Sequence, residues 1–318
     1  MVFSVRFFKR MILVVLALMI VIPICVAVWL GFSRGEERRR ADELDDQLAK
    51  TQTQLNALLA EDNVGSAYVP QTEENDPSNL FAAESMPYQE LFPNLYSEAE
   101  IPAQRIKADK TVYLTFDDGP SVNTKKILEA LDEADVKATF FVTAGELKTE
   151  NVCELLRDIR DGGHTIGIHS YSHEYLEIYK DIDSYLTDFN QMYELIYEAT
   201  GLKAEIFRFP GGSINAYDSG MYQPLIGEML RRGFVFYDWN ATGGDTLKGA
   251  TAASVVETVR ADINGKNRGI VLLHDSNEKG FVAEALPEVI ATLKKMGYTF
   301  EVLTPEVLPI VFSYNSRA

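Results

Sequence analysis

Cysteine is scarce in this sequence, since only Cys25 and Cys153 occur among 318 residues. Cys25 falls within a long apolar run, so Cys153 is the one thiol in the remainder and no internal disulfide can form there. We interpret Cys25 as a membrane-buried thiol and Cys153 as a buried apolar residue on a helix. The hydrophobic fraction of 46% is ample for a core without such crosslinks.

Basic residues are also few, with 30 Lys and Arg against 47 Asp and Glu, which gives a formal net charge of −17. Residues 1–40 hold seven of the basic side chains and only two acidic ones, so the acidic excess lies in the rest of the chain. An acidic surface repels the phosphate backbone. The composition therefore excludes nucleic acid as a partner.

Charged residues are absent from Met11 to Phe32. A helix of this length spans about 33 Å, enough to cross a hydrocarbon core of about 30 Å. We assign residues 1–34 to a cytoplasmic tail and a transmembrane signal-anchor, which predicts a single-pass protein of the cell membrane with its acidic bulk extracellular. A cleaved signal peptide is the alternative, but the run is long and no Ala-x-Ala site follows it.

Two segments of different composition follow the anchor. Residues 35–62 are helical in pattern, and apolar positions recur at alternating spacings of three and four from Ala41 to Leu58. This pattern fits either a short coiled coil that forms a homodimer or a single amphipathic stalk helix, and both remain open. Residues 63–107 are rich in Glu, Asn, Asp, Ser and Pro, which predicts a flexible spacer.

Residues 108–318 alternate between apolar strand-like runs and helical segments. This alternation predicts βαβ units and a parallel sheet. The expected fold class is α/β, a distorted (β/α)7-type barrel preceded by the transmembrane helix and the stalk. Chemistry in such a barrel lies at the carboxyl ends of the strands. The strands are expected at 111–116, 138–142, 164–168, 205–208, 233–237, 269–273 and 298–302, and the helices at 123–134, 151–161, 181–199, 221–232, 252–263 and 281–296.

Two adjacent carboxylates, Asp117 and Asp118, follow the first of these strands. Neighbouring residues of a strand point to opposite faces, so a turn must begin here if both side chains are to serve one site. Their charges repel each other unless a cation lies between them. The alternative is a solvated Asp-Gly turn at the start of the next helix, and the other strand ends decide between the two.

Two of only four histidines, His169 and His173, follow the third expected strand. Two imidazoles and one carboxylate are a typical ligand set for catalytic zinc, and Asp118 can supply the carboxylate. Cobalt and manganese suit the same ligands. Asp117 is then free to take a proton from water as the general base. His164 stands at the start of its strand, and we interpret it as structural.

These residues resemble the polysaccharide deacetylase family, also called the NodB homology or carbohydrate esterase 4 group, over roughly residues 108–303. Four stretches are similar to motifs of that family: Thr-Phe-Asp-Asp-Gly at 115–119, His-Ser-Tyr-Ser-His at 169–173, Phe-Arg-Phe-Pro-Gly-Gly at 207–212 and Ile-Val-Leu-Leu-His-Asp at 270–275. Each motif is moderately specific, and four in order over one domain are highly specific.

The resemblance implies roles for residues beyond the metal ligands. Asp117 is expected to be the catalytic base, and Arg208 to support it and keep it ionised near neutrality. The backbone N–H of Gly211 is expected to stabilise the tetrahedral oxyanion. His274 is expected to give a proton to the leaving amine.

The expected acetyl pocket is formed by Trp239 and Leu272, and its size favours acetyl over larger acyl groups modestly. Many family members have an aromatic residue after the proline of the third motif. Gly211 stands at that place here, so a ring that contacts substrate is missing.

A second departure concerns the acid that orients His274. The family usually has an Asp four residues before the tryptophan of its fourth motif, and Val235 occupies that place. Asp245 could replace it from the following loop, and so could Asp238.

Together these features predict a metal-dependent hydrolase that removes N-acetyl groups from an N-acetylated polysaccharide. Peptidoglycan N-acetylglucosamine is the expected substrate, because the anchor, stalk and spacer suit a polymer fixed near the membrane. An O-acetyl esterase on xylan-type glycans is one alternative. A metal-dependent phosphoesterase and a catalytically silent scaffold that binds the cell wall are two others.

Overall fold

The computed structural model describes residues 86–145, 147–218 and 220–312. The expected tail and anchor, the stalk and the first part of the spacer, residues 1–85, lie outside these residues. Within the part of the chain that the structure describes, no helix is both long enough and apolar enough to cross a bilayer.

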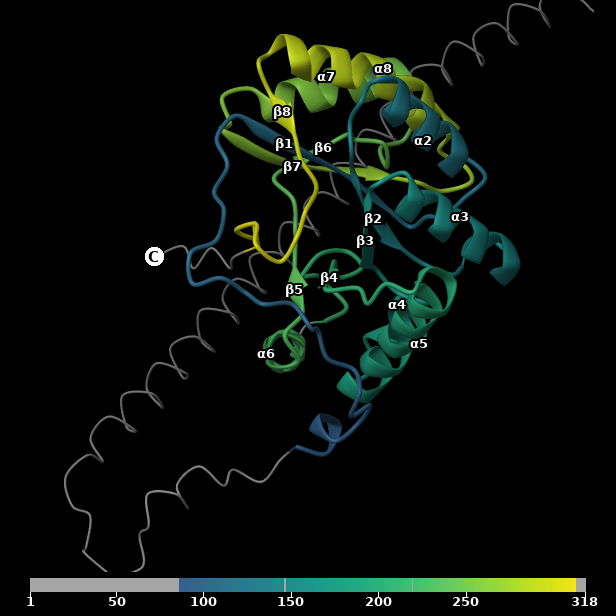
Figure 1. Ribbon diagram of the computed structural model, residues 1–318, viewed down its shortest axis with the longest axis vertical. Helices are drawn as coiled ribbons and strands as arrows, with labels where there is room; N and C mark the ends of the chain where they lie inside the picture. The colour runs from purple at the N-terminus through teal and green to yellow at the C-terminus, as the bar shows by residue number, and fades with distance from the viewer. Residues whose placement is uncertain (1–85, 146, 219, 313–318) are drawn as a thin grey trace, which may run out of the picture. The chain divides into compact units, whose positions relative to one another are not determined.

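Eight parallel strands form one curled sheet (Figure 1). Its order is β5-β4-β3-β2-β1-β7-β6, and β8 pairs with the first residues of β1. No pairing between β5 and β6 closes this sheet within the described residues, so the α/β barrel predicted from the sequence is present in a curled, open form. The strands are β1 (Thr111–Asp117), β2 (Thr139–Val142), β3 (Thr165–Ile168), β4 (Ile206–Phe207), β5 (Val235–Phe236), β6 (Ala241–Thr242), β7 (Arg268–His274) and β8 (Thr299–Phe300).

In the described part of the chain, six longer helices alternate with these strands and cover the outer face of the sheet. Consecutive contacts link α7 to α8, α8 to α2, α2 to α3 and α3 to α5. Figure 1 shows α7 and α8 lying over β1 and β7. These helices are α2 (Thr124–Glu133), α3 (Thr149–Asp161), α5 (Ile182–Thr200), α6 (Tyr222–Arg231), α7 (Ala252–Ile263) and α8 (Gly280–Lys295).

Three elements of the described residues were not predicted: the short 3₁₀ helix η2 (Pro87–Gln89), the single turn α4 (Tyr175–Ile178) and the two-residue strand β6. All three are too short to show a helical or strand periodicity in the sequence.

The central strand β1 is buried on both faces, which is why its sequence is almost continuously apolar. Leu114 and Phe116 pack into the large core between the sheet and the helices. Tyr113 packs into a separate cluster inside the curl of the sheet. Because side chains alternate along a strand, Thr115 and Asp117 lie on the same inner face as Tyr113. The strand thus delivers a carboxylate to the inner face at its carboxyl end.

The segment before β1 packs against the domain through Arg232, which follows α6. The Arg232 side chain is 1% exposed, and its Nε donates to Glu228 Oε1 at 2.6 Å. Its other nitrogens donate to four backbone carbonyls of the segment, those of Tyr88, Leu91, Phe92 and Leu95. Residues 86–95 of the expected spacer are therefore held on the domain.

Candidate metal centre and active site

The chain turns sharply between the two adjacent acids at the end of β1. Asp117 is the last residue of the strand, and Asp118 adopts a left-handed backbone conformation with φ of 75°. A non-glycine residue rarely adopts this conformation. The turn lets both carboxylates face the inner end of the sheet, which a continuing strand would not allow. Gly119 follows because a Cβ there would lie 2.4 Å from Oδ2 of Asp275.

His169 presents one ring nitrogen to Asp118, the second of these acids. Its Nδ1 lies 2.8 Å from the carbonyl oxygen of Arg208. A carbonyl can only accept, so Nδ1 carries the proton and Nε2 keeps its lone pair. That Nε2 lies 3.6 Å from Oδ1 of Asp118. Burial lowers the pKa of His169 to about 3, so the ring is neutral and able to bind a metal.

His173 completes a group of three donors. Its Nε2 lies 3.2 Å from Oδ1 of Asp118, and the donor atoms of Asp118, His169 and His173 all lie within 4.8 Å of one another. Tetrahedral ligands at about 2.1 Å from zinc are about 3.4 Å apart. The two Asp–His distances bracket that value, so these residues fit a single divalent cation. Like Asp118, His173 has a left-handed backbone, with φ of 59°.

Asp188 of α5 holds the loop that joins the two histidines. Its carboxylate accepts four hydrogen bonds of 2.6 to 2.8 Å, from the hydroxyls of Ser170 and Ser172 and from the backbone N–H groups of Tyr171 and Ser172. The Ser170 hydroxyl in turn accepts the N–H of His173 at 2.8 Å. Sequence analysis missed this residue, because an acid on a helix carries no local signal of such a role.

Arg208 lies behind Asp117, the first acid of the pair, on the inner face of the sheet. Its side chain is fully buried, and its guanidinium lies 4.3 Å from the ring centre of Phe141. It donates to Oδ1 of Asp117 at 2.7 Å and to the hydroxyl of Thr115 at 2.8 Å. Oδ2 of Asp117 remains on the metal side, 3.9 Å from Nε2 of His169.

The pKa of Asp117 is raised above its ordinary value. Burial raises it, and the positive charge of Arg208 opposes this without cancelling it. Arg208 therefore favours the ionised form of Asp117, in the direction expected from the sequence, but it does not fully offset the desolvation of the carboxylate. A cation bound beside it would favour the ionised form again. A raised pKa suits a group that must accept a proton.

His274 ends β7 directly opposite Asp117 in the register of the two strands. Its Nδ1 lies 3.0 Å from Oδ1 of Asp245, and its backbone N–H donates to Oδ2 of Asp245 at 2.8 Å. Burial lowers the pKa of His274, but the hydrogen bond and charge of Asp245, together with the charges of Asp117 and Asp118, outweigh it and the net shift is upward.

Asp238, the other acid considered for this role, faces elsewhere. Its carboxylate accepts the backbone N–H of Ser213 at 2.9 Å, the Ser213 hydroxyl at 2.5 Å and the backbone N–H of Phe312 at 2.6 Å. Asp238 therefore ties the loop after β4 to the end of the described chain, and the acid beside His274 is Asp245.

The residues expected to bind substrate lie around the same hollow as the catalytic candidates. Gly211, Trp239 and Leu272 line a cavity of about 370 Å³ together with Asp117, Asp118, His169, His173 and His274. Three further lining residues were not predicted: Tyr175, Thr246 and Lys279. The cavity thus joins a metal-ligand cluster, a buried base, an ion-paired histidine and an apolar wall.

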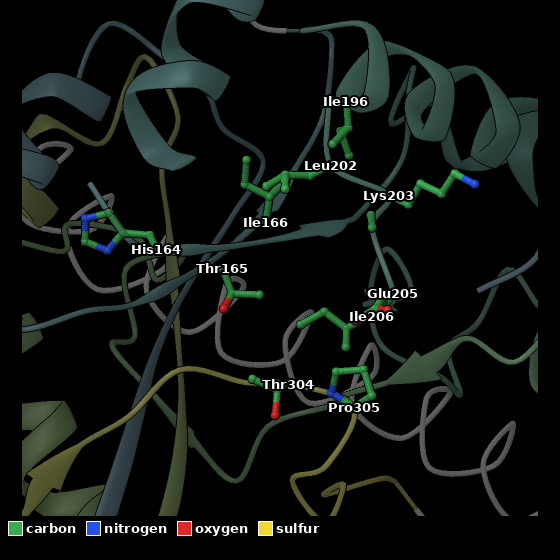
Figure 2. Close-up of a pocket in the computed structure, with 11 residues that line it drawn as sticks. His164, Thr165, Ile166, Ile196, Leu202, Lys203, Glu205, Ile206, Thr304 and Pro305 are labelled. Atoms are coloured by element: carbon green, nitrogen blue, oxygen red, sulfur yellow. The ribbon is translucent and has the colours of Figure 1, made fainter. Parts of the chain in front are cut away.

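A different hollow lies at the amino ends of β3 and β4, far from this cluster along the strands. Figure 2 shows His164, Ile166 and Glu205 among the residues that line it. Burial lowers the pKa of His164 to about 4, and its Nδ1 accepts the Ala138 backbone N–H at 3.1 Å. These contacts agree with a structural role for His164.

Comparison with known proteins gives a consistent picture. A sequence profile of the polysaccharide deacetylase family matches residues 104–219. A peptidoglycan-N-acetylglucosamine deacetylase of Bacillus cereus is 30% identical over 217 residues, which cover 66% of this chain and 76% of the relative. The peptidoglycan-N-acetylmuramic acid deacetylase PdaA of Bacillus subtilis is 31% identical over 195 residues, covering 61% and 70%.

The fold agrees with the same family. The crystal structure of the catalytic domain of a peptidoglycan N-acetylglucosamine deacetylase from Eubacterium rectale matches with a TM-score of 0.63 and 35% identity. The match covers 68% of this chain and 98% of that domain. The curled parallel sheet, the four motifs in order and these matches show that this chain belongs to the polysaccharide deacetylase family of hydrolases.

Proposed function

We propose that this protein is a divalent-metal-dependent N-deacetylase that acts on N-acetylglucosamine residues of peptidoglycan. The observation that carries the proposal is the joint placement of three groups around one cavity. These are the Asp118–His169–His173 cluster, Asp117 and His274. Hydrolysis of an acetamide needs a base for water, a polarised carbonyl and an acid for the amine, and the three groups correspond to those needs.

A divalent ion held by Asp118, His169 and His173 would supply polarisation of the acetyl carbonyl and a lowered pKa for the attacking water. Zinc is the ion expected from this ligand set, with cobalt and manganese as alternatives. Asp117 takes the proton of the attacking water at its Oδ2, because Oδ1 is bonded to Arg208. The Gly211 N–H is proposed to stabilise the oxyanion, a contribution of about 3 kcal/mol for such a donor.

We propose that His274 completes the reaction as the proton donor. Asp245 holds its Nδ1, which leaves Nε2 to give a proton to the nitrogen as the C–N bond breaks. The products are acetate and the free amine of the sugar. Trp239 and Leu272 supply the apolar wall for the acetyl methyl group.

The substrate and the location of the enzyme rest on the relatives and on the sequence. The Bacillus cereus relative bears the name of a peptidoglycan-N-acetylglucosamine deacetylase. We propose that residues 11–32 anchor this chain in the cell membrane with the catalytic domain outside, next to the wall polymer. We propose further that residues 35–62 form a stalk. Crosslinking in the membrane would test whether the stalks of two chains contact each other in a homodimer.

Acetate release from purified peptidoglycan by the full chain tests the activity. The wild type should release acetate in the presence of zinc. Asp117→Asn and His169→Ala should each lose at least about 100-fold in rate, because one removes the base and the other a metal ligand. His164→Gln is the matched control, since His164 lies at the amino end of its strand, and it should retain activity.

Further outcomes distinguish the proposed N-deacetylase from the alternative functions. An O-acetylated xylan oligomer that reacts faster than an N-acetylglucosamine oligomer would assign the chain as an O-acetyl esterase. Undiminished acetate release by Asp117→Asn and His169→Ala would show that the mechanism is wrong. Absence of both metal binding and acetate release would favour a scaffold role.

A further inference from the structure

Tyr175 occupies the space beside Gly211 in the cavity. A Cβ built on Gly211 would lie 3.1 Å from Cε1 and 3.4 Å from the hydroxyl of Tyr175. Gly211 also has φ of 77°, which favours glycine. Both the close approach of Tyr175 and the backbone conformation therefore disfavour a side chain at position 211, and the ring of Tyr175 forms this part of the cavity wall.

The ring of Tyr175 is fixed relative to the metal cluster. It packs edge-on against the ring of His173, with centroids 5.2 Å apart and an interplanar angle of 83°. It comes from the first residue of α4, two residues after that ligand. Its half-buried ring nevertheless keeps a surface toward the cavity.

Tyr217 extends this aromatic surface away from the cavity. Its ring lies 4.9 Å from that of Tyr175 at an angle of 56°, and the residue is 51% exposed. No rearrangement is needed to make it accessible.

The loop under Tyr217 is held in place, although it is irregular. The Asn215 side chain accepts the N–H of Tyr217 at 2.8 Å and donates to the carbonyls of Gly212 and Pro210 at 3.0 and 3.2 Å. The Pro210 carbonyl also accepts the hydroxyl of buried Tyr179 at 2.7 Å. The position of the Tyr217 ring relative to the cavity is thus defined by the fold.

We propose that Tyr175 and Tyr217 form an aromatic binding subsite for the pyranose rings of the glycan, an inference that rests on the proposed function. A pyranose with equatorial substituents presents an apolar face of axial C–H bonds, and such a face buries well against an aromatic ring. Tyr175, next to the metal ligands, contacts the sugar that reacts. Tyr217, farther out, contacts a neighbouring sugar and makes the enzyme prefer a chain over a single residue.

Chain-length dependence of the kinetics tests this assignment in the full-length protein. For a pentamer of N-acetylglucosamine, Tyr217→Leu should raise KM about 2- to 10-fold and leave kcat within about twofold, because it removes binding common to ground and transition states. For a dimer the same variant should change little. Tyr175→Leu should raise KM for both, and Tyr217→Trp and Tyr175→Phe should restore wild-type values. Tyr197→Leu is the control, because Tyr197 is a 50% exposed tyrosine on α5.

Two readouts keep this subsite distinct from the catalytic centre. Hydrolysis of a small aryl acetate reports on the centre alone, and Tyr217→Leu should leave it unchanged. If the wild type releases no acetate from any oligomer, the proposed function is wrong. In that case the subsite is still tested by binding. Calorimetry would compare the affinity for the pentamer of the Asp118→Asn protein with that of the Asp118→Asn protein that also carries Tyr217→Leu. Equal pentamer KM values and equal pentamer affinities for Tyr217→Leu and its parent would overturn the proposal.

Discussion

Asp245 accepts two hydrogen bonds from His274, one from Nδ1 at 3.0 Å and one from the backbone N–H at 2.8 Å. The carboxylate therefore fixes both the ring orientation and the end of β7. It also forms an ion pair with the ring. Burial raises the pKa of Asp245 and lowers that of His274, but the hydrogen bond and the opposite charges of the two groups oppose burial in both cases. The net pKa of Asp245 is lowered and that of His274 is raised, so both shifts favour the charged pair.

Replacing Asp245 should narrow the pH range of activity from the alkaline side. The proton donor is protonated His274, so activity is lost as pH rises through its pKa. Asp245→Asn removes the charge that raises this pKa, while the burial that lowers it remains. The alkaline limb of kcat/KM should therefore move to lower pH, and the rate at pH 8 should fall at least about tenfold. A pH–rate profile on an N-acetylglucosamine oligomer measures both.

Asp238→Asn provides the control for this profile. Asp238 is also a buried acid of the same region, but its partners are Ser213 and Phe312. Its replacement should lower kcat by loosening the loop and leave the alkaline limb in place. A shift of that limb in Asp238→Asn, with none in Asp245→Asn, would reverse the assignment.

Binding of metal should stabilise the fold, because the ligands approach one another only in the folded chain. Zinc added to chelator-treated protein at about 100 times its Kd should contribute about 2.7 kcal/mol to the free energy of unfolding. This corresponds to a rise in Tm of about 5 to 10 °C for a domain of this size. Asp118→Asn should remove most of that rise, as calorimetry with and without zinc would show.

In the same experiment, Asp117→Asn tests whether Asp117 is a metal ligand or only the general base. Because Asp117 is bonded to Arg208 and is not one of the three clustered donors, this variant should keep the zinc-dependent rise in Tm. It should nevertheless lose activity. Loss of the thermal shift in Asp117→Asn would make Asp117 a ligand.

Asp188 is predicted to act on metal affinity through the loop between the histidines. Asp188→Ala leaves the hydroxyls of Ser170 and Ser172 and the backbone N–H groups of Tyr171 and Ser172 without their acceptor. Loss of such outer contacts typically lowers metal affinity about 10- to 100-fold. Activity should recover when zinc is raised in proportion. Asp183→Ala, an exposed acid in the first turn of α5, should leave the zinc titration unchanged.

Arg232 should contribute strongly to the stability of the domain. Arg232→Met removes the donor for four carbonyls and leaves Glu228 with only Arg231 as its ionic partner. Breaking a buried ion pair costs about 3 to 5 kcal/mol. Arg231→Met is matched to it, because Arg231 pairs with the same Glu228 but its side chain is 37% exposed. That variant should cost less than about 1 kcal/mol in urea unfolding.

The sequence predicted the order of strands and helices closely. The seven expected strands correspond to β1–β5, β7 and β8, with shifts of a few residues at their ends. Buried parallel strands are short apolar runs, and the helices between them show amphipathic periodicity, so both signals are local. The turn expected between Asp117 and Asp118 was predictable for the same reason, since two adjacent strand residues cannot share a face.

The open form of the sheet was not predictable in this way. β4, β5 and β8 are only two residues long, and whether the edges of a sheet meet depends on twist accumulated over all its strands. Residues 86–95 are a comparable case. Their composition is typical of a spacer, and contacts with the distant Arg231 and Arg232, together with the burial of Leu95, hold them on the domain.

Sequence alone determined which residue types could carry the chemistry, because carboxylates and imidazoles recur at fixed spacings after the strands. It left open whether Asp245 or Asp238 lies beside His274, and it gave no indication of Asp188 or of the paired rings of Tyr175 and Tyr217. Only the tertiary structure decided these partners. Each is a contact between segments far apart in the chain, and such contacts depend on how the sheet curls and where each helix packs.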